Sequence, residues 1–316
     1  MMLDIIIYLA FFLAIALSYG IICLGLNLQW GQTGLFNVGV AGFVAIGAYV
    51  SALLTTPEAA QRFGGFDWPI WGGWIAGALA AALASVLTGA VALRLRADYL
   101  AISTFGIATT IHLVALNAES LTGGPFGIAF IPRLFAGLES EPMKFNFLNF
   151  LFVAAISAGV YGGLEILMRS PWGRVLRAIR EDEVAAVSLG KNATSFRLQA
   201  FALGGAIMGL GGALQAHLIG FIAPENYLPT LTFQVWAMLI IGGSGNNRGA
   251  LLGAVAVWGL WSLSGAVLSG FVPAEHQARV AALRIVLIGV VLAGVLLVRP
   301  RGILGEKILV SRFLRE

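Results

Sequence analysis

The sequence predicts an all-α integral membrane protein, built as a polytopic bundle of transmembrane helices. Of its 316 residues, 59% are hydrophobic and only 11% are charged, whereas soluble domains carry about 25% charged residues. The mean hydropathy is +0.90, and several apolar runs reach the roughly 20 residues that a helix needs to cross a bilayer. A soluble protein needs more charged residues than this to cover its core. We therefore expect most of the chain to lie in the membrane.

Nine segments are candidate membrane crossings, although a count of eight or ten also fits the sequence. The first has no basic residues before it and no small-residue cleavage site after it, so we expect a retained helix rather than a signal peptide. The segment 230–242 is too short for a straight crossing and is expected to be tilted, broken or re-entrant. The candidates are residues 5–26, 31–55, 69–93, 97–118, 147–168, 197–219, 230–242, 250–270 and 280–298.

The distribution of basic residues predicts the orientation of these crossings. With the N-terminus outside, the inner loops and the C-terminal tail hold 14 of the 19 Lys and Arg residues. Cytoplasmic loops of membrane proteins collect Lys and Arg, so this orientation is favoured. The basic cytoplasmic loops also account for the net charge of +4, which in a soluble protein would suggest binding to nucleic acid. The inner segments are 94–96, 169–197, 243–249 and 299–316.

The crossing 31–55 is unusually polar in its first half, where Gln32, Thr33 and Asn37 lie among four glycines. Glycine destabilises a helix interior by about 1 kcal/mol relative to alanine. Two interpretations stay open: a glycine-rich helix packed tightly on its neighbours, or a broken helix that faces a water-filled path. They are compatible, because irregular backbone at membrane depth is tolerated where it is buried or lines a cavity.

The crossing 97–118 is the most polar of all and includes Ser103, Thr104 and His112. An ionisable group within the membrane suggests function, although a lone histidine is more often a hydrogen-bonded packing residue. Four pairs of glycines at four-residue spacing predict close helix contacts in a compact bundle. These pairs are Gly73/Gly77, Gly159/Gly163, Gly205/Gly209 and Gly249/Gly253.

The segment 119–146 is expected to be an extracytoplasmic loop with short helices. It begins with the turn-forming run Thr122-Gly123-Gly124-Pro125 and carries three acidic residues. The loop is long enough to receive a partner protein, but a solvated connection between two helices explains it equally well.

The segment 169–197 is the longest charged stretch inside the chain. Ser170 and Pro171 suit a helix start, and Gly190 suits a helix stop. An acidic cluster at 181–183 interrupts a basic stripe, so anionic lipid would repel part of this helix, and a protein groove suits it better. We therefore expect one or two short amphipathic helices that dock on a partner. The stripe consists of Arg174, Arg177 and Arg180.

The sequence lacks the motifs of an enzyme. It has no phosphate-binding loop of the GxxxxGK[ST] type, no zinc-binding HExxH and no nucleophile elbow. The single cysteine, Cys23, allows neither an internal disulfide nor a thiolate metal site. Paired carboxylates that could relay protons are also missing from the crossings. We expect no cofactor in this chain, and if the protein is a pump, its energy comes from another chain.

Three blocks of sequence resemble the permease subunits of branched-chain amino acid ABC importers, in the LivM-like branch of the LivH/LivM permeases. The resemblance spans about residues 5–305. In the third block, Glu183-x-Ala185-Ala186 followed by Gly190 is similar to the Glu-Ala-Ala loop with which such permeases engage their ATPases. The blocks are residues 31–37, residues 98–104 continuing to 121–124, and residues 170–190.

The resemblance implies a permease domain over residues 1–306, with a cytoplasmic coupling loop at 169–197 and a basic tail at 307–316. It implies two cytoplasmic ATPases that bind ATP and magnesium, a second LivH-like permease, and an extracytoplasmic substrate-binding protein. The location implied is a bacterial-type cytoplasmic (inner) membrane. The residues expected to couple to the ATPases are Arg174, Arg177, Arg180, Glu181, Glu183, Ala185, Ala186 and Gly190.

A neutral or zwitterionic cargo suits crossings with so few charges, because a fixed ionic site in the membrane is costly and would trap it. Urea, short amides or a simple sugar carried by the same machinery are alternatives to a branched-chain amino acid. An ATP-independent secondary transporter is a further alternative, against which the missing carboxylate pairs argue. The residues expected near the translocation path are Gln32, Thr33, Asn37, Ser103 and Thr104.

Overall fold

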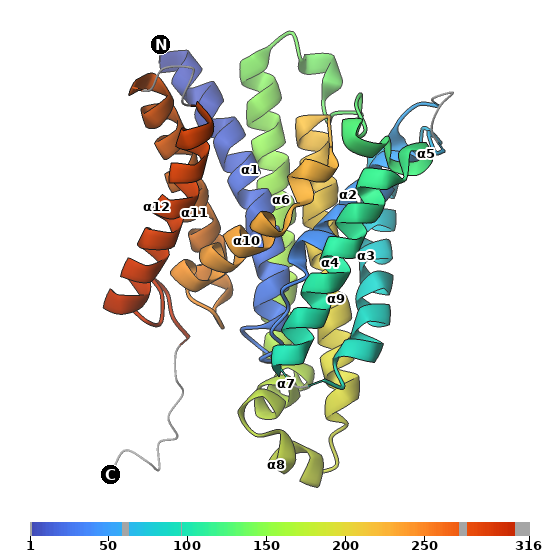
Figure 1. Ribbon diagram of the computed structural model, residues 1–316, viewed down its shortest axis with the longest axis vertical. Helices are drawn as coiled ribbons and strands as arrows, with labels where there is room; N and C mark the ends of the chain where they lie inside the picture. The colour runs from blue at the N-terminus through green and yellow to red at the C-terminus, as the bar shows by residue number, and fades with distance from the viewer. Residues whose placement is uncertain (1, 59–62, 96, 272–276, 307–316) are drawn as a thin grey trace.

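The computed structural model describes residues 2–58, 63–95, 97–271 and 277–306, which form a bundle of α-helices (Figure 1). Within these residues there is no β-sheet, only an isolated antiparallel bridge between Ile128 and Ile222. The α-helices are α1 Met2–Gln29, α2 Val40–Thr55, α3 Ile70–Ala92, α4 Ala97–Asn117, α5 Glu119–Thr122, α6 Pro142–Arg169, α7 Pro171–Glu181, α8 Glu183–Ser188, α9 Ala193–Ile219, α10 Pro229–Gly242, α11 Asn247–Phe271 and α12 Gln277–Val298. Three short 3₁₀ turns are Gly124–Phe126, Ala136–Leu138 and Pro224–Tyr227.

The membrane character predicted from composition is confirmed. Among the described residues, five helices are long and apolar enough to cross a bilayer, and three more apolar helices or helix portions are shorter. Leu79, Leu83 and Leu87 of α3 follow one another at helical spacing and are all well exposed, as expected of a face that meets lipid. The five long helices are Ile5–Gln29, Ile70–Ala92, Asp98–Asn117, Pro142–Arg169 and Ala193–Ile219.

Helix α9 is the centre of the bundle. Its apolar window is 72% buried, against 17% for the peripheral helix α6. Close contacts of glycines explain how α2, α3 and α9 come together. A Cβ built at Gly47 would lie 2.1 Å from the Gly209 carbonyl oxygen, and one at Gly77 would lie 2.5 Å from the Gly47 carbonyl oxygen. Small residues thus allow backbones to approach where hydrophobicity alone cannot drive association in lipid.

Three of the four predicted glycine pairs make such contacts, but the pair Gly159/Gly163 does not. No atom outside the local helix lies within 4 Å of a Cβ built at either position, so these glycines face away from the rest of the chain. Gly253 shows the opposite situation, because its Cβ would meet the Met238 carbonyl oxygen at 1.9 Å. Spacing alone therefore does not reveal which helix face packs inside the protein.

The expectation of one crossing over residues 31–55 is corrected by the structure. The helix α2 begins only at Val40, and residues 34–39 have no regular structure. Gly34 has a φ of +73°, which favours glycine and breaks the helical path. The chain leaves α1 at the end of the bundle near α7 and α8 (the α7–α8 end) and turns back into the bundle before α2 begins (Figure 1). The break in the helix is therefore confirmed, and a water-filled path beside it stays a prediction.

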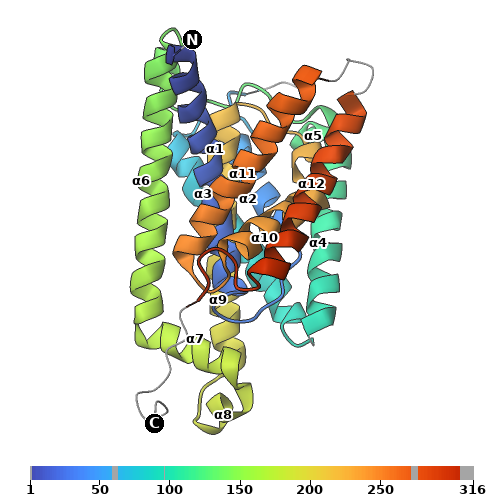
Figure 2. The same cartoon turned by 90° about the vertical axis from the view of Figure 1, so that its left-hand side faces the viewer.

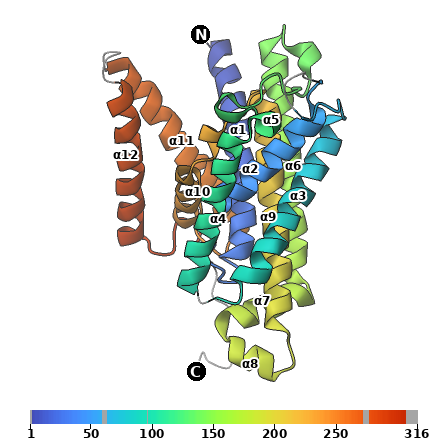
Figure 3. The same ribbon diagram turned by 45° about the vertical axis from the view of Figure 1, so that its right-hand side comes forward.

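The short segment 230–242 lies within α10, a helix of 14 residues. It is continued at its N-terminal side by the 3₁₀ turn Pro224–Tyr227 and by the bridge residue Ile222. The crossing is therefore broken into a helix and an irregular part. Helices α11 and α12 follow as a hairpin at one side of the bundle (Figure 3). The predicted loop 119–146 contains α5 and two 3₁₀ turns, and it ends earlier than expected because α6 begins at Pro142.

The segment 299–306 after α12 returns to the C-terminal end of α10. The amides of Ile303 and Leu304 donate to the carbonyls of Ile241 and Gly242, each at 2.9 Å. The last described residue, Glu306, thereby reaches the α7–α8 end. The tail 307–316 that the sequence marks as basic lies outside the described residues.

We predict opposite effects for alanine at Gly47 and at Gly159. At Gly47 the new Cβ meets the Gly209 carbonyl, and overpacking of this kind costs about 1–3 kcal/mol. At Gly159 the Cβ meets open space, so the higher helix propensity of alanine stabilises by up to about 1 kcal/mol. Thermal unfolding of the two purified variants in detergent measures both effects. A Gly47→Ala protein that unfolds at or above the wild-type temperature would contradict the close approach of α2 and α9.

Candidate functional site

The helix pair α7–α8 projects from one end of the bundle. α7 turns sharply from the end of α6 and crosses beneath the bundle (Figure 2). Pro171 occupies the first turn of α7, and Gly173 is buried where a Cβ would lie 2.4 Å from the Met168 carbonyl oxygen. Leu176 and Ile179 are buried against the body of the protein. One face of α7 is therefore packed inside the protein, and the other face is open to partners.

The predicted start and stop signals of this segment lie where expected, with one difference. Ser170 precedes α7, but its hydroxyl donates to the Leu167 carbonyl and does not cap the helix. The Asp182 side chain caps α8 by accepting a hydrogen bond from the Ala185 amide at 2.9 Å. Gly190 follows α8 with a φ of +76°, as is typical of a helix C-terminus.

Helix α8 presents apolar side chains at its outer end. Val184 and Leu189 are 77% and 79% exposed, and Val187 is also exposed. We call these three residues the α8 apolar tip. Ala186, in contrast, is buried, with Ile179 and Ala193 as neighbours. Exposed apolar groups among charged residues are typical of a surface that contacts another protein.

The predicted coupling residues divide into two groups. Arg174, Glu181, Ala185 and Gly190 are exposed at the surface of the helix pair. The others have partners within the chain or face inward. Glu183 forms an ion pair with Arg197 at 2.8 Å. The remaining three are Arg177, which lines a cavity, Arg180, which is bound inside the protein, and the buried Ala186.

Arg180 joins α7 to two other elements. Its Nη1 donates a hydrogen bond to the Gly31 carbonyl, and the same group lies 3.0 Å from Glu306 Oε2. Gly31 belongs to the turn after α1, directly before the helix break at residues 34–39. Arg180 is therefore not simply a surface cation. It connects the projecting helix pair to the helix break and to the segment 299–306.

Buried hydrogen bonds stabilise the helix break at residues 34–39. Asn37 Nδ2 donates to Gln29 Oε1 at 2.7 Å, and Asn37 Oδ1 accepts from the Gly39 amide at 2.7 Å. The Val38 amide donates to Thr104 Oγ1 at 3.0 Å. The Trp236 indole donates to the Asn37 carbonyl at 3.0 Å. Peptide groups that a continuous helix would satisfy are thus satisfied by Asn37 itself and by side chains of α4 and α10, while Gln29 of α1 holds the Asn37 side chain.

The five residues expected near the translocation path occupy different places. Asn37 and Thr104 meet at the helix break and are fully or almost fully buried. Gln32 and Thr33 lie nearer the α7–α8 end, where Thr33 donates to the Gln29 carbonyl. Ser103 donates to the Leu100 carbonyl of its own helix. Their role in transport stays a prediction.

Sequence reasoning missed Gln29, Thr232 and Trp236. Gln29 is buried at the end of α1 and also donates to the Phe201 carbonyl of α9 at 2.8 Å. Thr232 accepts from the Ala41 amide at 3.0 Å. A glutamine at the end of a long apolar run was the available signal, because polar groups in lipid need partners. His112 Nδ1 lies 3.1 Å from the Pro224 carbonyl oxygen, which agrees with a packing role.

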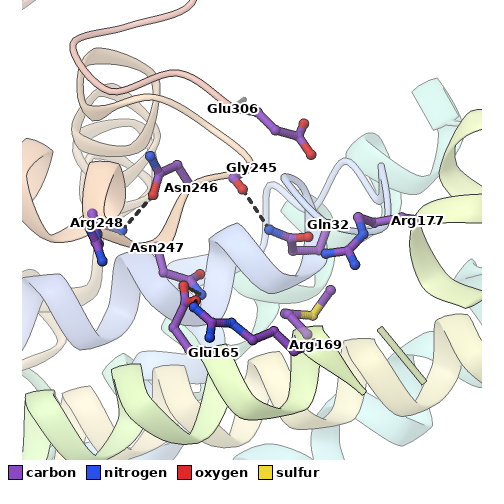
Figure 4. A pocket seen from close by; sticks show the side chains of 10 residues that line it. Gln32, Glu165, Arg169, Arg177, Gly245, Asn246, Asn247, Arg248 and Glu306 are labelled. Carbon is purple, nitrogen blue, oxygen red and sulfur yellow. Dashed lines mark hydrogen bonds and ion pairs between the residues drawn. The ribbon is translucent and has the colours of Figure 1, made fainter. Parts of the chain in front are cut away.

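A cavity of about 500 Å³ opens at the α7–α8 end (Figure 4). It lies between the end of α6, the helix α7 and the turn that precedes α11. Its lining is mostly polar and combines three arginines with two carboxylates. No group of three or more metal-binding side chains occurs in the described part of the chain. Its charged lining residues and one glutamine are Gln32, Glu165, Arg169, Arg177, Arg248 and Glu306.

These features define a multi-pass membrane permease: an α-helical bundle, a glycine-packed core and a helix pair that projects from one end. The chain belongs to the family described as "Branched-chain amino acid transport system / permease component", which it matches over residues 8–296.

The chain is similar to several curated members of this family. It is 36% identical over 76% of its length to the high-affinity branched-chain amino acid transport system permease protein LivM of Escherichia coli, and it covers 60% of that protein. It is 31% identical to a probable LivM permease of Methanocaldococcus jannaschii, with 75% of each chain covered. The LivH permease of Escherichia coli is 26% identical over 92% of both chains. No solved structure gives a significant match.

We predict that Asn37→Leu destabilises the fold rather than only slowing transport. The change leaves Gln29 Oε1 and the Gly39 amide without these partners, and a buried unsatisfied polar group costs about 1–3 kcal/mol. The variant should unfold at a lower temperature and enter the membrane in smaller amount. Ser103→Ala serves as the control, because Ser103 bonds only to its own helix turn and its loss should change the unfolding temperature little. Wild-type stability of Asn37→Leu would contradict the structural role of Asn37.

Proposed function

We propose that this chain is a permease subunit of an ATP-driven ABC importer that moves branched-chain or similar neutral amino acids into the cytoplasm. The observation that carries the proposal is the family match over residues 8–296. The projecting pair α7–α8, with its exposed apolar tip, supports a contact with a separate ATPase. The curated relatives named LivM support the cargo.

The partners follow from the same proposal. Two cytoplasmic ATPases bind ATP and magnesium, while this chain hydrolyses nothing and holds no cofactor. A second, LivH-like permease completes the pathway, and the similarity of this chain to LivH supports a pair of related subunits. An extracytoplasmic binding protein delivers the cargo. The chain lies in the cytoplasmic (inner) membrane with its N-terminus outside and its C-terminus inside, which places α7 and α8 in the cytoplasm, where the basic loops gather.

We predict that Leu189→Asp removes the ATPase from the purified complex. A carboxylate in place of an apolar tip residue must be desolvated at the interface, so binding should weaken by at least about tenfold. The measurement is the amount of ATPase that co-purifies with the tagged chain from its native membrane. Phe126→Asp is the control, because Phe126 is 87% exposed in the loop at the other end of the bundle. Undiminished ATPase in the Leu189→Asp preparation would refute docking at α8.

Arg180 provides a physical route from the ATPase to the helix break. A displacement of α7 pulls on the Gly31 carbonyl and on Glu306 through one guanidinium. Hydrogen bonds to charged groups contribute about 1.5–3 kcal/mol, enough to bias two arrangements of the break. We propose that this link couples ATP-driven motion of α7–α8 to opening of the translocation path.

We predict that Arg180→Gln lowers amino acid uptake per ATP hydrolysed by about tenfold while the ATPases stay bound. The expected loss corresponds to about 1.4 kcal/mol of coupling between α7 and the break. Uptake and hydrolysis are measured together in proteoliposomes. Lys191→Gln removes an exposed charge from the same segment and should leave the ratio unchanged. A wild-type ratio in Arg180→Gln would exclude this link from the coupling mechanism.

A further inference from the structure

The cavity at the α7–α8 end holds two arginines without a carboxylate partner. Glu165 accepts from Asn247 Nδ2 at 3.1 Å and lies 3.5 Å from Arg169, so that carboxylate is paired. Glu306 is paired with Arg180 at 3.0 Å. Among the described residues, no carboxylate oxygen lies within ion-pair distance of the other two lining arginines, Arg177 and Arg248.

The two arginines differ in how they are held, because the Tyr161 hydroxyl and the nearby charge of Glu165 raise the pKa of Arg248. Arg248 is oriented by its Nε, which donates to the Tyr161 hydroxyl at 3.1 Å and leaves its two terminal nitrogens available. Arg177 makes no hydrogen bond or ion pair with the described part of the chain, and its side chain extends toward Gln32 (Figure 4). The two guanidinium groups thus line the cavity from opposite ends, Arg248 beside Asn246 and Arg177 beside Gln32 (Figure 4), and an anion bound near Gln32 would neutralise Arg177.

Gln32 adds an independent observation. Its side chain is only 4% exposed, and its Nε2 donates to the Gly245 carbonyl at 2.8 Å. Its Oε1 is buried and has no hydrogen-bond partner. Because an unsatisfied buried acceptor costs about 1–3 kcal/mol, a ligand with a donor at this point would be favoured. The cavity therefore selects an anion that carries a hydrogen-bond donor beside its charge.

The surroundings point to lipid as the source of that anion. α6 is the helix of which only 17% of the apolar window is buried, and Ile166, next to Glu165, is 75% exposed. Leu252, one turn beyond Arg248 on α11, is 48% exposed. Apolar helix faces suited to acyl chains thus begin directly beside the cavity. Tyrosine and arginine, as in the pair Tyr161–Arg248, are the side chains that gather at a membrane surface.

We propose that this cavity binds the headgroup of an anionic glycerophospholipid. The phosphodiester accepts hydrogen bonds from Arg177, since arginine binds phosphate through several donors. A headgroup hydroxyl, as in phosphatidylglycerol, donates to Gln32 Oε1. The bound lipid lies against α6, α7 and the turn before α11, so it holds together the elements that surround Arg180. The proposal does not depend on the identity of the cargo.

The test is a titration of the full chain, purified in detergent with its co-purifying subunits, with phosphatidylglycerol. Binding is followed by native mass spectrometry and by thermal unfolding. Phosphatidylethanolamine with the same acyl chains, inorganic phosphate and leucine are titrated in parallel. Arg177→Gln should bind phosphatidylglycerol about tenfold more weakly than the wild type, and Arg177→Lys should lie between them. Lys191→Gln is the control, because it removes an exposed positive charge from the segment after α8, and Lys191 does not line the cavity. Arg174→Gln is a second control that removes the same charge one turn earlier on α7, where Arg174 donates to the Arg169 carbonyl at 3.2 Å.

Each outcome decides the proposal. One phosphatidylglycerol per chain, retained by the wild type, by Lys191→Gln and by Arg174→Gln and lost from Arg177→Gln, supports it. Equal retention by Arg177→Gln overturns it. Stabilisation by inorganic phosphate as strong as that by phosphatidylglycerol assigns the site to a soluble anion, and displacement of the lipid by leucine assigns it to the cargo; either result overturns the lipid assignment. Because Arg177 has no partner among the described residues, its replacement should leave the lipid-free unfolding temperature unchanged.

Discussion

The hydrogen bond between Asn37 and Gln29 is the interaction on which the rest of the bundle depends. A chain in lipid has no water to satisfy its peptide groups, so a helix can be interrupted only where side chains replace the missing bonds. Asn37 provides this replacement for the Gly39 amide, and its own side chain is held in place because it donates to Gln29 Oε1. The interruption allows α2 to begin deep in the bundle, with α4 and α10 packed around its start.

The glycines of the core make this arrangement sterically attainable. Gln29 reaches the Phe201 carbonyl only because α1 lies directly against α9, where Gly25 and Gly204 face each other. A Cβ at Gly25 would lie 2.6 Å from the Gly204 carbonyl oxygen. Close backbone contact and polar bonding therefore support one another. The same pairing of small residues and buried amides recurs where Asn27 binds Asn247 near Gly245.

Much of the fold was predictable from the sequence, because apolar length and the placement of Lys and Arg report directly on the membrane. The polarity of residues 31–39 also indicated a break, although periodicity could not decide between a packed helix and an interrupted one. The direction of the side chains in the projecting segment was not predictable. In an α-helix a step of three residues falls about 60° short of a full turn. Side chains at this spacing therefore point in progressively different directions, and the stripe that begins with Arg174 at the surface ends with Arg180 inside the protein. Gln29 was missed although Asn37 is near it in the sequence, because its second partner, the Phe201 carbonyl, lies 172 residues away.

The buried bonds of α1 also affect how the protein is made. α1 precedes its partners in the chain, so Gln29 must wait for the Phe201 carbonyl, 172 residues later, and Asn27 must wait for Asn247, 220 residues later. During synthesis these amides are without their final partners, which is costly in lipid. The polar contacts of α1 are therefore completed only after α9 and the start of α11 have been made.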